Sequence, residues 1–376
     1  LVEKGYKIAM VEQVEDPKAT KGIVKRDVVK ILTPGTCVLG NVENKENNYL
    51  ACIKEVGKNF LLAYTDVTTG DCYITSLESF SEVVNELLNL HIKEVVVSSK
   101  FNKKMTEQLI NTYSIIVSYE DNYEVPSYLG ALIVDLESKD ELLTFGLLVN
   151  YILKTQREKL THLKSVIKYE ANQYLKIDMH SKRNLEITET LRLGQRNGSL
   201  LHLLDKCHTA MGSRMLNKWL NHPLIDVKAI RERQEYVTRF MNDFVLRSEI
   251  ENALKTVYDL ERIVGRISCG NCNAKDLAQL RRSLSNIPNI KELLINTNDS
   301  LLVKMGNEID PISEVHELLV KALVENPPLV IKEGGMFNPE FDEQLLELTN
   351  LKNNSKEWIL NYEITEREKT GIKTLK

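Results

Sequence analysis

The sequence is poor in aromatic residues and has no long apolar run. Phe, Trp and Tyr together make up 6% of the 376 residues, and only two Trp are present. No apolar run approaches the roughly 20 residues that a membrane-spanning helix needs, and no signal peptide is visible, so we expect no membrane contact. The content of 43% hydrophobic and 27% charged residues is typical of a soluble globular protein, and 376 residues are enough for two or three domains.

Cysteine is also scarce, and its spacing excludes a disulfide framework. Six Cys stand at positions 37, 52, 72, 207, 269 and 272, as in a protein of a reducing cytosol. Cys269 and Cys272 have the spacing of half a zinc site, but no second half follows. A redox dithiol would require a βαβ context, whereas the flanking segments have a helical pattern. We therefore interpret the pair as two incidental thiols in a turn between helices.

Catalytic and nucleotide-binding motifs are absent from the sequence. It contains no Gly-x-x-x-x-Gly-Lys-Ser/Thr loop, no HExxH pair and no Gly-x-Ser-x-Gly elbow. The segments 262–270 and 333–335 contain glycine, but they lack the lysine and the strand context of a phosphate-binding loop. We expect no enzymatic activity, no cofactor and no metal site within this chain.

The net charge of −4 hides an uneven distribution. Residues 34–150 hold 8 Lys or Arg against 17 Asp or Glu, a net charge of −9, whereas residues 151–220 hold 13 against 6, a net charge of +7. An acidic surface binds phosphate poorly, and a basic helical block is better suited to it. Charge alone leaves two interpretations of the basic block open, a phosphate-binding surface and a solvated helix surface.

The first 150 residues have strand-like patterns joined by turns. Runs at 6–13 and 24–31 alternate like strands, with a break at Glu15-Asp16-Pro17. The turn Thr33-Pro34-Gly35-Thr36 indicates a boundary. Three β-rich runs then predict an antiparallel meander, and alternating helical and strand-like segments follow it. We predict strands at 49–56, 59–66, 71–76, 94–98 and 114–119, and helices at 79–90, 103–112 and 138–152.

From residue 150 onward the chain has an almost wholly helical pattern. Met211, Met215 and Trp219 fall on one helical face, and Asp226 can cap the next helix. Further apolar stripes run through 250–267 and through 277–287, the latter closed by Pro288. We interpret these stripes as core packing. A mostly polar helix over about 340–369 would be roughly 45 Å long and is expected to project from the core.

Six short sequence motifs resemble those of a known protein family. They are Asn184–Thr190, Ser199–Asp205, Thr209–Leu216, Trp219–Leu224, Asp259–Ile263 and Asp276–Leu280. The residues of these motifs and their order along the chain resemble the core domain of the MutS family of DNA mismatch repair proteins. Because the chain opens in an alternating apolar segment without Met and stops after a Gly turn, we interpret it as an internal portion of a longer protein.

The resemblance implies a multidomain α/β and all-α protein. Residues 1–33 would close the mismatch-recognition domain, and 34–150 would form a ribonuclease H-like connector domain. Residues 151–340 would form a mainly helical core or lever domain, and 341–376 a long lever helix with the truncated start of the clamp domain. Ribonuclease H enzymes hold two metal ions with clustered carboxylates. Asp66 could belong to such a set, but no convincing partners accompany it, so we interpret Asp66 as a turn residue.

The resemblance also implies a mechanical role in mismatch repair: this part of the protein would couple the nucleotide state of the ATPase to the clamping of mismatched double-stranded DNA. The full-length protein is expected to be a homodimeric ABC-type ATPase that uses ATP and Mg and binds the MutL matchmaker through its connector domain. A related family member acting in recombination, and a structural helical scaffold, are the alternatives; residues 1–33 argue against the first, since such paralogues usually lack the mismatch domain. Five basic residues are candidates for contacts to the DNA backbone, or equally for stabilising the C-termini of helices: Lys182, Arg183, Arg192, Arg196 and Arg214.

Overall fold

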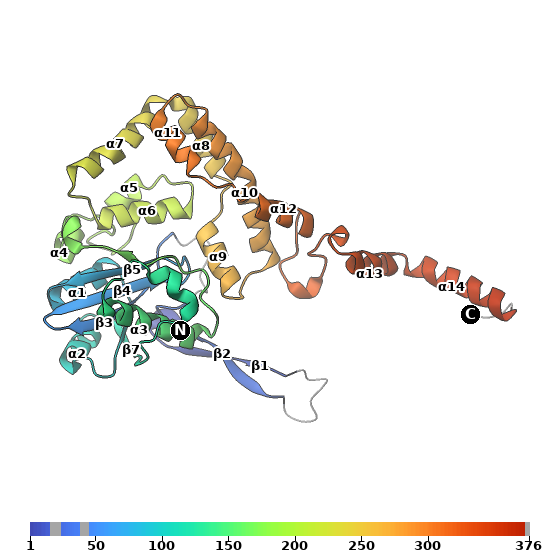
Figure 1. Cartoon of the computed structure of the whole chain (residues 1–376), viewed down its shortest axis with the longest axis horizontal. Coiled ribbons are helices and arrows are strands. Elements are labelled where there is room, and N and C mark those ends of the chain that lie inside the picture. The colour runs from blue at the N-terminus through green and yellow to red at the C-terminus, as the bar shows by residue number, and fades with distance from the viewer. Residues whose placement is uncertain (16–23, 38–44, 373–376) are drawn as a thin grey trace.

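The computed structural model describes residues 1–15, 24–37 and 45–372, arranged as a hairpin, a sheet domain and a helical array (Figure 1). The break predicted at Asp16-Pro17 lies outside the described residues. Strands β1 (Ile8–Gln13) and β2 (Arg26–Leu32) pair antiparallel and form the hairpin. It extends away from the sheet domain in Figure 1, and only the end of β2 is buried, where it packs against the following domain.

The second sheet has six strands in the order β7-β6-β3-β4-β5-β8. The meander β3-β4-β5 is antiparallel, while β6, β7 and β8 add parallel strands at its two edges. A meander followed by parallel strand–helix–strand units confirms the ribonuclease H-like connector. The strands are β3 (Tyr49–Val56), β4 (Asn59–Asp66), β5 (Cys72–Leu77), β6 (Glu94–Val97), β7 (Ile116–Tyr119) and β8 (Ile167–Lys168).

Helices cover both faces of this sheet. Because side chains alternate along a strand, Leu50 and Cys52 of β3 pack into the core beneath α3 (Lys139–Gln156), and Ala51 and Ile53 pack towards α1 (Phe80–Asn89) and α2 (Lys103–Asn111). Ser79 caps α1 through the Glu82 amide, as predicted. The central strands are therefore buried on both faces, which explains their near-continuous apolar sequence.

The rest of the described chain is helical and rests on two smaller cores. One core joins α8, α10 and α11, and the other joins α9, α10 and α12. Figure 1 shows α7 and α10 diverging from the region of α8 and α11 towards the sheet domain. The helices are α4 (Met179–Asn184), α5 (Leu200–Leu204), α6 (Ala210–Asn221), α7 (Val227–Asn242), α8 (Phe244–Leu254), α9 (Leu260–Ser268), α10 (Ala274–Ile295), α11 (Ser300–Asn307), α12 (Ser313–Ala322), α13 (Glu343–Asn353) and α14 (Ser355–Thr370).

Short polar side chains start most of these helices. Asp226 accepts the Ala229 amide at 2.9 Å, which confirms the predicted cap of α7. Asn273 and Asp276 form a reciprocal capping box at the start of α10. Short 3₁₀ segments complete the described elements: η1 (Val2–Lys4), η2 (Ser127–Ile133), η3 (Ala171–Gln173), η4 (Ile331–Glu333) and η5 (Pro339–Phe341). Among the described residues, no helix is long and apolar enough to cross a membrane.

Three helix predictions were wrong in detail. Pro288 does not end its helix, because α10 continues through it to Ile295 and buries Ile290 and Leu294 beyond it. The stripe at 250–267 divides between α8 and α9, since Asp259 caps a new helix. The polar segment predicted as one helix divides at Asn354 into α13 and α14. These two helices do project from the array (Figure 1).

The apolar stripes are less buried than predicted. Val237 and Met241 of α7 are more than half exposed, and α7 contains no buried residue. Met215 and Trp219 of α6 are 51% and 40% exposed. The predicted domain boundaries at 33, 150 and 340 stay predictions. In the structure, α3 runs across residue 150, and β8 joins the sheet as late as Ile167.

Candidate functional site at the junction of the sheet domain and the helical array

The turn between β4 and β5 is the part of the sheet domain that meets the helical array. Asp66 ends β4 with a fully buried carboxylate that accepts bonds from the Thr68 amide at 2.8 Å, the Thr68 hydroxyl at 2.6 Å and the Asn48 amide at 3.1 Å. All of its partners therefore come from nearby loops, which confirms Asp66 as a turn residue. The described residues contain no group of three or more His, Cys, Asp or Glu able to hold a metal ion.

Helix α9 packs against this turn without intervening side chains. A Cβ atom on Gly265 would lie only 2.2 Å from the Thr68 carbonyl oxygen, so only glycine permits this approach. His162, in the segment after α3, places Nε2 2.7 Å from the Val67 carbonyl oxygen. The Lys164 amide donates to the Gly70 carbonyl at 2.8 Å. The turn is therefore held from both sides, by α9 and by the segment after α3.

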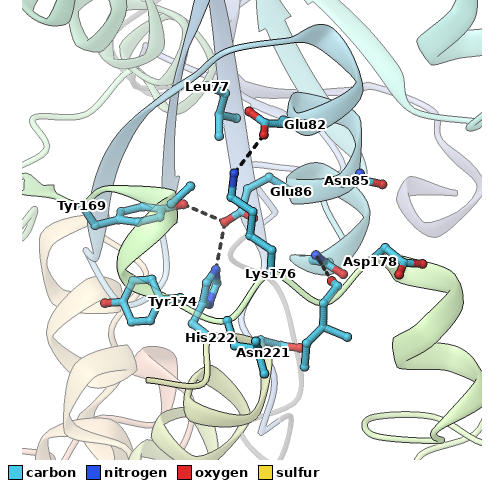
Figure 2. Close-up of a pocket in the computed structure, with 14 residues that line it drawn as sticks. Leu77, Glu82, Asn85, Glu86, Tyr169, Tyr174, Lys176, Asp178, Asn221 and His222 are labelled. Atoms are coloured by element: carbon cyan, nitrogen blue, oxygen red, sulfur yellow. Dashed lines mark hydrogen bonds and ion pairs between the residues drawn. The ribbon is translucent and has the colours of Figure 1, made fainter. Parts of the chain in front are cut away.

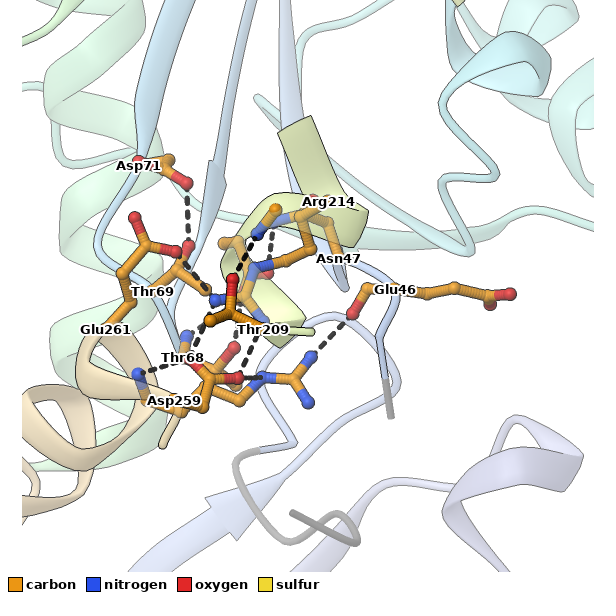
Figure 3. A network of polar contacts seen from close by, with 12 residues as sticks. Glu46, Asn47, Thr68, Thr69, Asp71, Thr209, Arg214, Asp259 and Glu261 are labelled. Carbon is orange, nitrogen blue, oxygen red and sulfur yellow. Dashed lines mark hydrogen bonds and ion pairs between the residues drawn. The ribbon is translucent and has the colours of Figure 1, made fainter. Parts of the chain in front are cut away.

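A buried ion pair joins α6 to the start of α9. The Arg214 guanidinium donates two bonds of 2.7 Å to the two carboxylate oxygens of Asp259, and a third of 2.7 Å to Glu261 (Figure 3). The side chains of Arg214 and Asp259 are only 5% and 2% exposed. Burial alone would raise the pKa of Asp259, but the bonds and charge of Arg214 outweigh it and hold that pKa below its ordinary value. Asp259 is therefore ionised at neutral pH.

Lys164 extends the ion pair into the sheet domain. Its ammonium group donates to Glu261 at 2.7 Å and to Asp71 of the β4–β5 turn at 2.8 Å. Burial lowers the pKa of Lys164, but the hydrogen bonds that it donates to Asp71 and Glu261 outweigh that effect and raise the pKa. The network thus runs without interruption from Asp71 through Lys164 and Glu261 to Arg214.

Helix α6 presents a basic stripe to the sheet domain at intervals of four residues. Below Arg214, the Lys218 ammonium lies 4.4 Å from the centre of the Tyr73 ring and donates to its hydroxyl at 2.9 Å. At the end of the helix, His222 Nε2 lies 2.9 Å from Glu86 Oε1 on α1. Residues four apart share one helical face. The basic face of α6, and not the apolar face that the sequence indicated, therefore meets the sheet domain.

The predicted DNA-contacting residues lie in different environments. Arg214 is committed to its buried pair, and Lys182 is buried with its ammonium group bonded to the Asn89 carbonyl at 3.2 Å. Both cations are therefore engaged by protein partners, and DNA contact by these two residues stays a prediction. Burial lowers the pKa of Lys182 to about 8. Arg196 is paired with Asp205, while Arg183 and Arg192 are exposed, and for these three residues DNA contact stays a prediction.

Several junction residues were not singled out by the sequence. The block Asp259–Ile263 was recognised as a motif, but Arg214, the partner of its two carboxylates, precedes Asp259 by 45 residues and Glu261 by 47. The spacing of Arg214, Lys218 and His222 was the available signal, since it places three basic groups on one face of a helix. Cys269 and Cys272 lie in the turn between α9 and α10, as predicted.

The fold and its junction define the class of the protein: a ribonuclease H-like α/β domain joined to an all-α array. Comparison with family models agrees with this division. MutS domain I matches residues 1–41, MutS domain II matches 48–164, and MutS domain III matches 180–375. The chain belongs to the MutS family.

Curated relatives match over the whole chain. The protein named DNA mismatch repair protein MutS from Geobacillus sp. (strain WCH70) is 43% identical over 378 residues, covering 100% of this chain and 44% of the relative. Relatives of the same name from Bacillus thuringiensis (strain Al Hakam) and Bacillus cereus (strain AH187) are each 44% identical over 379 residues, with 43% and 42% of their lengths covered. The chain thus spans less than half the length of these relatives.

Proposed function

We propose that this chain serves DNA mismatch repair as the connector and lever part of a MutS protein. Family membership over the whole chain supports the repair role. The observation that carries the mechanical role is the network from Asp71 to Arg214, because it joins the sheet domain to the helices. An ABC-type ATPase elsewhere in the protein, using ATP and Mg, would drive the helices, and the junction would pass that movement to the connector.

The partners follow from the same proposal. The whole protein would bind mismatched double-stranded DNA as a homodimer in the cytoplasm, and its acidic connector would bind a MutL-type matchmaker. Reversing the exposed acids Glu107 and Glu137 should weaken MutL capture by the whole protein and leave its DNA affinity nearly unchanged. A large, salt-sensitive rise in DNA affinity would contradict a protein-facing surface. The match of residues 1–41 to MutS domain I favours repair over a recombination role.

The chain alone should not discriminate between duplexes. A fluorescence-anisotropy titration with homoduplex and with G·T heteroduplex should give equal dissociation constants of roughly 10⁻⁴–10⁻⁶ M at physiological salt. Added ATP should change neither curve. A tenfold preference for the heteroduplex, about 1.4 kcal/mol, would show that recognition lies within residues 1–376 and that this division of labour is wrong.

The coupling role is tested in the whole protein with Gly265→Ala. The added Cβ would push α9 away from Thr68, so ATP should release heteroduplex more slowly from the variant, while its heteroduplex affinity without ATP stays the same. Gly130→Ala is the matched control, because nothing lies within 4 Å of a Cβ there. Equal release rates in the two variants would favour a purely structural scaffold.

A further inference from the structure

A cavity of about 320 Å³ lies between the sheet of the connector and α6 of the helical array. The strands β3, β4 and β5 contribute one tyrosine each to its lining, and Asn217 and Lys218 line it from α6. Its volume falls within the range of roughly 300–1,000 Å³ that small-molecule sites occupy. The cavity is thus large enough for a ligand and is built by both sides of the domain junction.

Lys218 brings a cation without a carboxylate partner into this cavity. Its ammonium group donates to the Tyr73 hydroxyl at 2.9 Å, and among the described residues it forms no ion pair. Burial lowers the pKa of Lys218. The charge of Asp71 opposes that effect, and the charges of Lys164 and Arg233 add to it. Because an ammonium group carries three donors and a nearby anion favours its charged form, Lys218 is suited to hold an anion.

Two further donors are open to the cavity. Tyr49 is 9% exposed, and among the described residues its hydroxyl forms no hydrogen bond. Asn217 accepts through Oδ1 from Asn221 Nδ2 at 3.1 Å, so its own Nδ2 has no described acceptor. Asn221 Oδ1 is unpaired and has no accessible surface, whereas the Tyr49 hydroxyl and Asn217 Nδ2 are not among the atoms enclosed in that way. A ligand in the cavity can therefore reach both donors.

The charged groups of the lining differ in exposure. Three cations and two acids are present: Lys93, Arg196, Lys218, Glu46 and Glu189. Both acids belong to exposed residues, which places them at the rim, and Glu189 lies 3.9 Å from His91 Nδ1. Arg196 is bonded to Asp205. The less exposed interior of the described lining therefore carries N–H and O–H donors and no carboxylate.

The neighbouring space has the opposite chemistry. Figure 2 shows its acids already engaged, with Glu82 bonded to Lys176 and Glu86 bonded to His222. The two cavities share only Asn221 and His222 among their described lining residues. An anion is therefore favoured only on the side of the junction where Lys218 lies.

We propose that this cavity binds the phosphate group of a small phosphate monoester, with Lys218, Asn217 and Tyr49 donating to its oxygens. Such a group carries a charge of about −1.5 to −2 and three acceptor oxygens, which match the three donors. The cavity is larger than a phosphate group, so it leaves room for a small organic body beside the tyrosine rings. Because Tyr49 lies on β3 and the other two donors lie on α6, the bound ligand bridges the connector and the helical array.

The first test needs no variant. Glycerol phosphate should bind the chain saturably in calorimetric titration, and glycerol, which lacks the phosphate, should not bind. The bound phosphate should also slow the acetylation of Lys218 by acetic anhydride severalfold, as followed by mass spectrometry. Exposed Lys228 on α7 is the internal control and should react at an unchanged rate. No saturable binding of glycerol phosphate, or equal protection of the two lysines, would overturn the proposal.

Variants locate the site. Lys218→Met removes the cation and should weaken glycerol phosphate binding at least tenfold. Tyr49→Phe removes only a hydroxyl from a buried ring and should weaken binding severalfold. Lys228→Met is the matched control and should bind as the unmodified chain does. Circular dichroism checks that each variant is folded. Unchanged binding by folded Lys218→Met and Tyr49→Phe variants would place the phosphate elsewhere and refute the assignment.

The phosphate can come from a free metabolite or from a phosphorylated side chain of a partner protein. Glycerol phosphate and a short phosphoserine peptide, with the unphosphorylated peptide as control, distinguish these sources. Tighter binding of glycerol phosphate identifies a free ligand, and tighter binding of the phosphoserine peptide identifies a partner side chain. Equal binding of the two peptides would contradict the need for a phosphate. Displacement of glycerol phosphate by duplex DNA would assign these donors to a DNA-contacting surface and overturn the proposal.

Discussion

Replacing Arg214 with Met leaves the carboxylate of Asp259 buried without its bidentate partner. Asp259 is only 2% exposed and cannot be rehydrated without opening the contact between α6 and α9. Removing one member of such a pair costs about 3–5 kcal/mol of unfolding free energy. Glu261 is 28% exposed and keeps its bond to Lys164, so its contribution to the loss is small. We therefore expect Arg214→Met to lower the stability of the helical array by about 3–5 kcal/mol.

The assay is urea denaturation followed by circular dichroism and by the fluorescence of Trp219, which lies on the same helix as Arg214. A double-mutant cycle with Asp259→Asn isolates the pair, because Asn preserves the helix cap. Arg247→Met is the control, since the Arg247–Glu251 pair is 38% and 50% exposed, and such pairs contribute about 0–1 kcal/mol. A loss of less than about 1 kcal/mol for Arg214→Met, equal to that of an exposed pair, would refute the reasoning.

The pair also gives the stability a defined pH dependence. The pKa of Asp259 is lower in the folded chain than its ordinary value of about 3.9. A group with a lowered folded pKa stabilises the fold above its unfolded pKa, and this contribution is lost as pH falls through the folded value. The difference in stability between the unmodified chain and Asp259→Asn should therefore be constant near neutral pH and shrink below about pH 4. An increase in that difference on acidification would contradict the assignment.

Three further outcomes follow from exposure and packing. Gly265→Ala should destabilise the chain by about 1–3 kcal/mol through overpacking against Thr68, and Gly130→Ala should not; equal melting temperatures would contradict the close approach. Trypsin should cut first at Lys332, beside Ile331 with 75% exposure, and release α13 with α14; first cleavage inside the sheet domain would be unexpected. Reversing Arg183 and Arg192 together should weaken non-specific duplex binding and reduce the salt slope by about 2, whereas Lys58→Glu should not; unchanged binding would exclude both as phosphate contacts.

The strands of the sheet domain were readable from the sequence because their signals are local. The β-rich runs and the turns at Gly57 and Gly70 determine the meander, and each predicted strand lies within two or three residues of its observed position. The cap at Ser79 was readable for the same reason. Local patterns therefore predicted the α/β part of the fold well.

The helical array was predicted less accurately because burial there depends on distant partners. The apolar face of α6 indicated a core position for Trp219, yet that side chain is 40% exposed and its ring lies 4.0 Å below the Arg233 guanidinium. Pro288 is tolerated because the helix on both sides of it packs into cores. The partners of Arg214 could not be inferred, since periodicity reports a face of a helix and not what lies against it.

The three contacts of α6 with the sheet domain indicate which part of the helical array can open locally. Arg214, Lys218 and His222 lie at steps of about 6 Å along one face, so α6 cannot turn or slide without losing contacts to Glu261, Tyr73 or Glu86. Helix α9 is also fixed in place, because Gly265 packs directly against Thr68 and the helix shares a core with α10 and α12. Helix α7, which connects α6 to α8, contains no buried residue.

Local opening requires little loss of packing in such a helix, because few apolar contacts oppose it. In native-state hydrogen exchange, the amides of α7 should exchange faster than those of α6 and α10, and Arg214→Met should accelerate exchange in α6 while leaving α7 nearly unchanged. The β3 and β4 amides serve as the internal reference, since those strands are buried on both faces. Protection of α7 equal to that of α6 would show that the array moves as one rigid body with the connector.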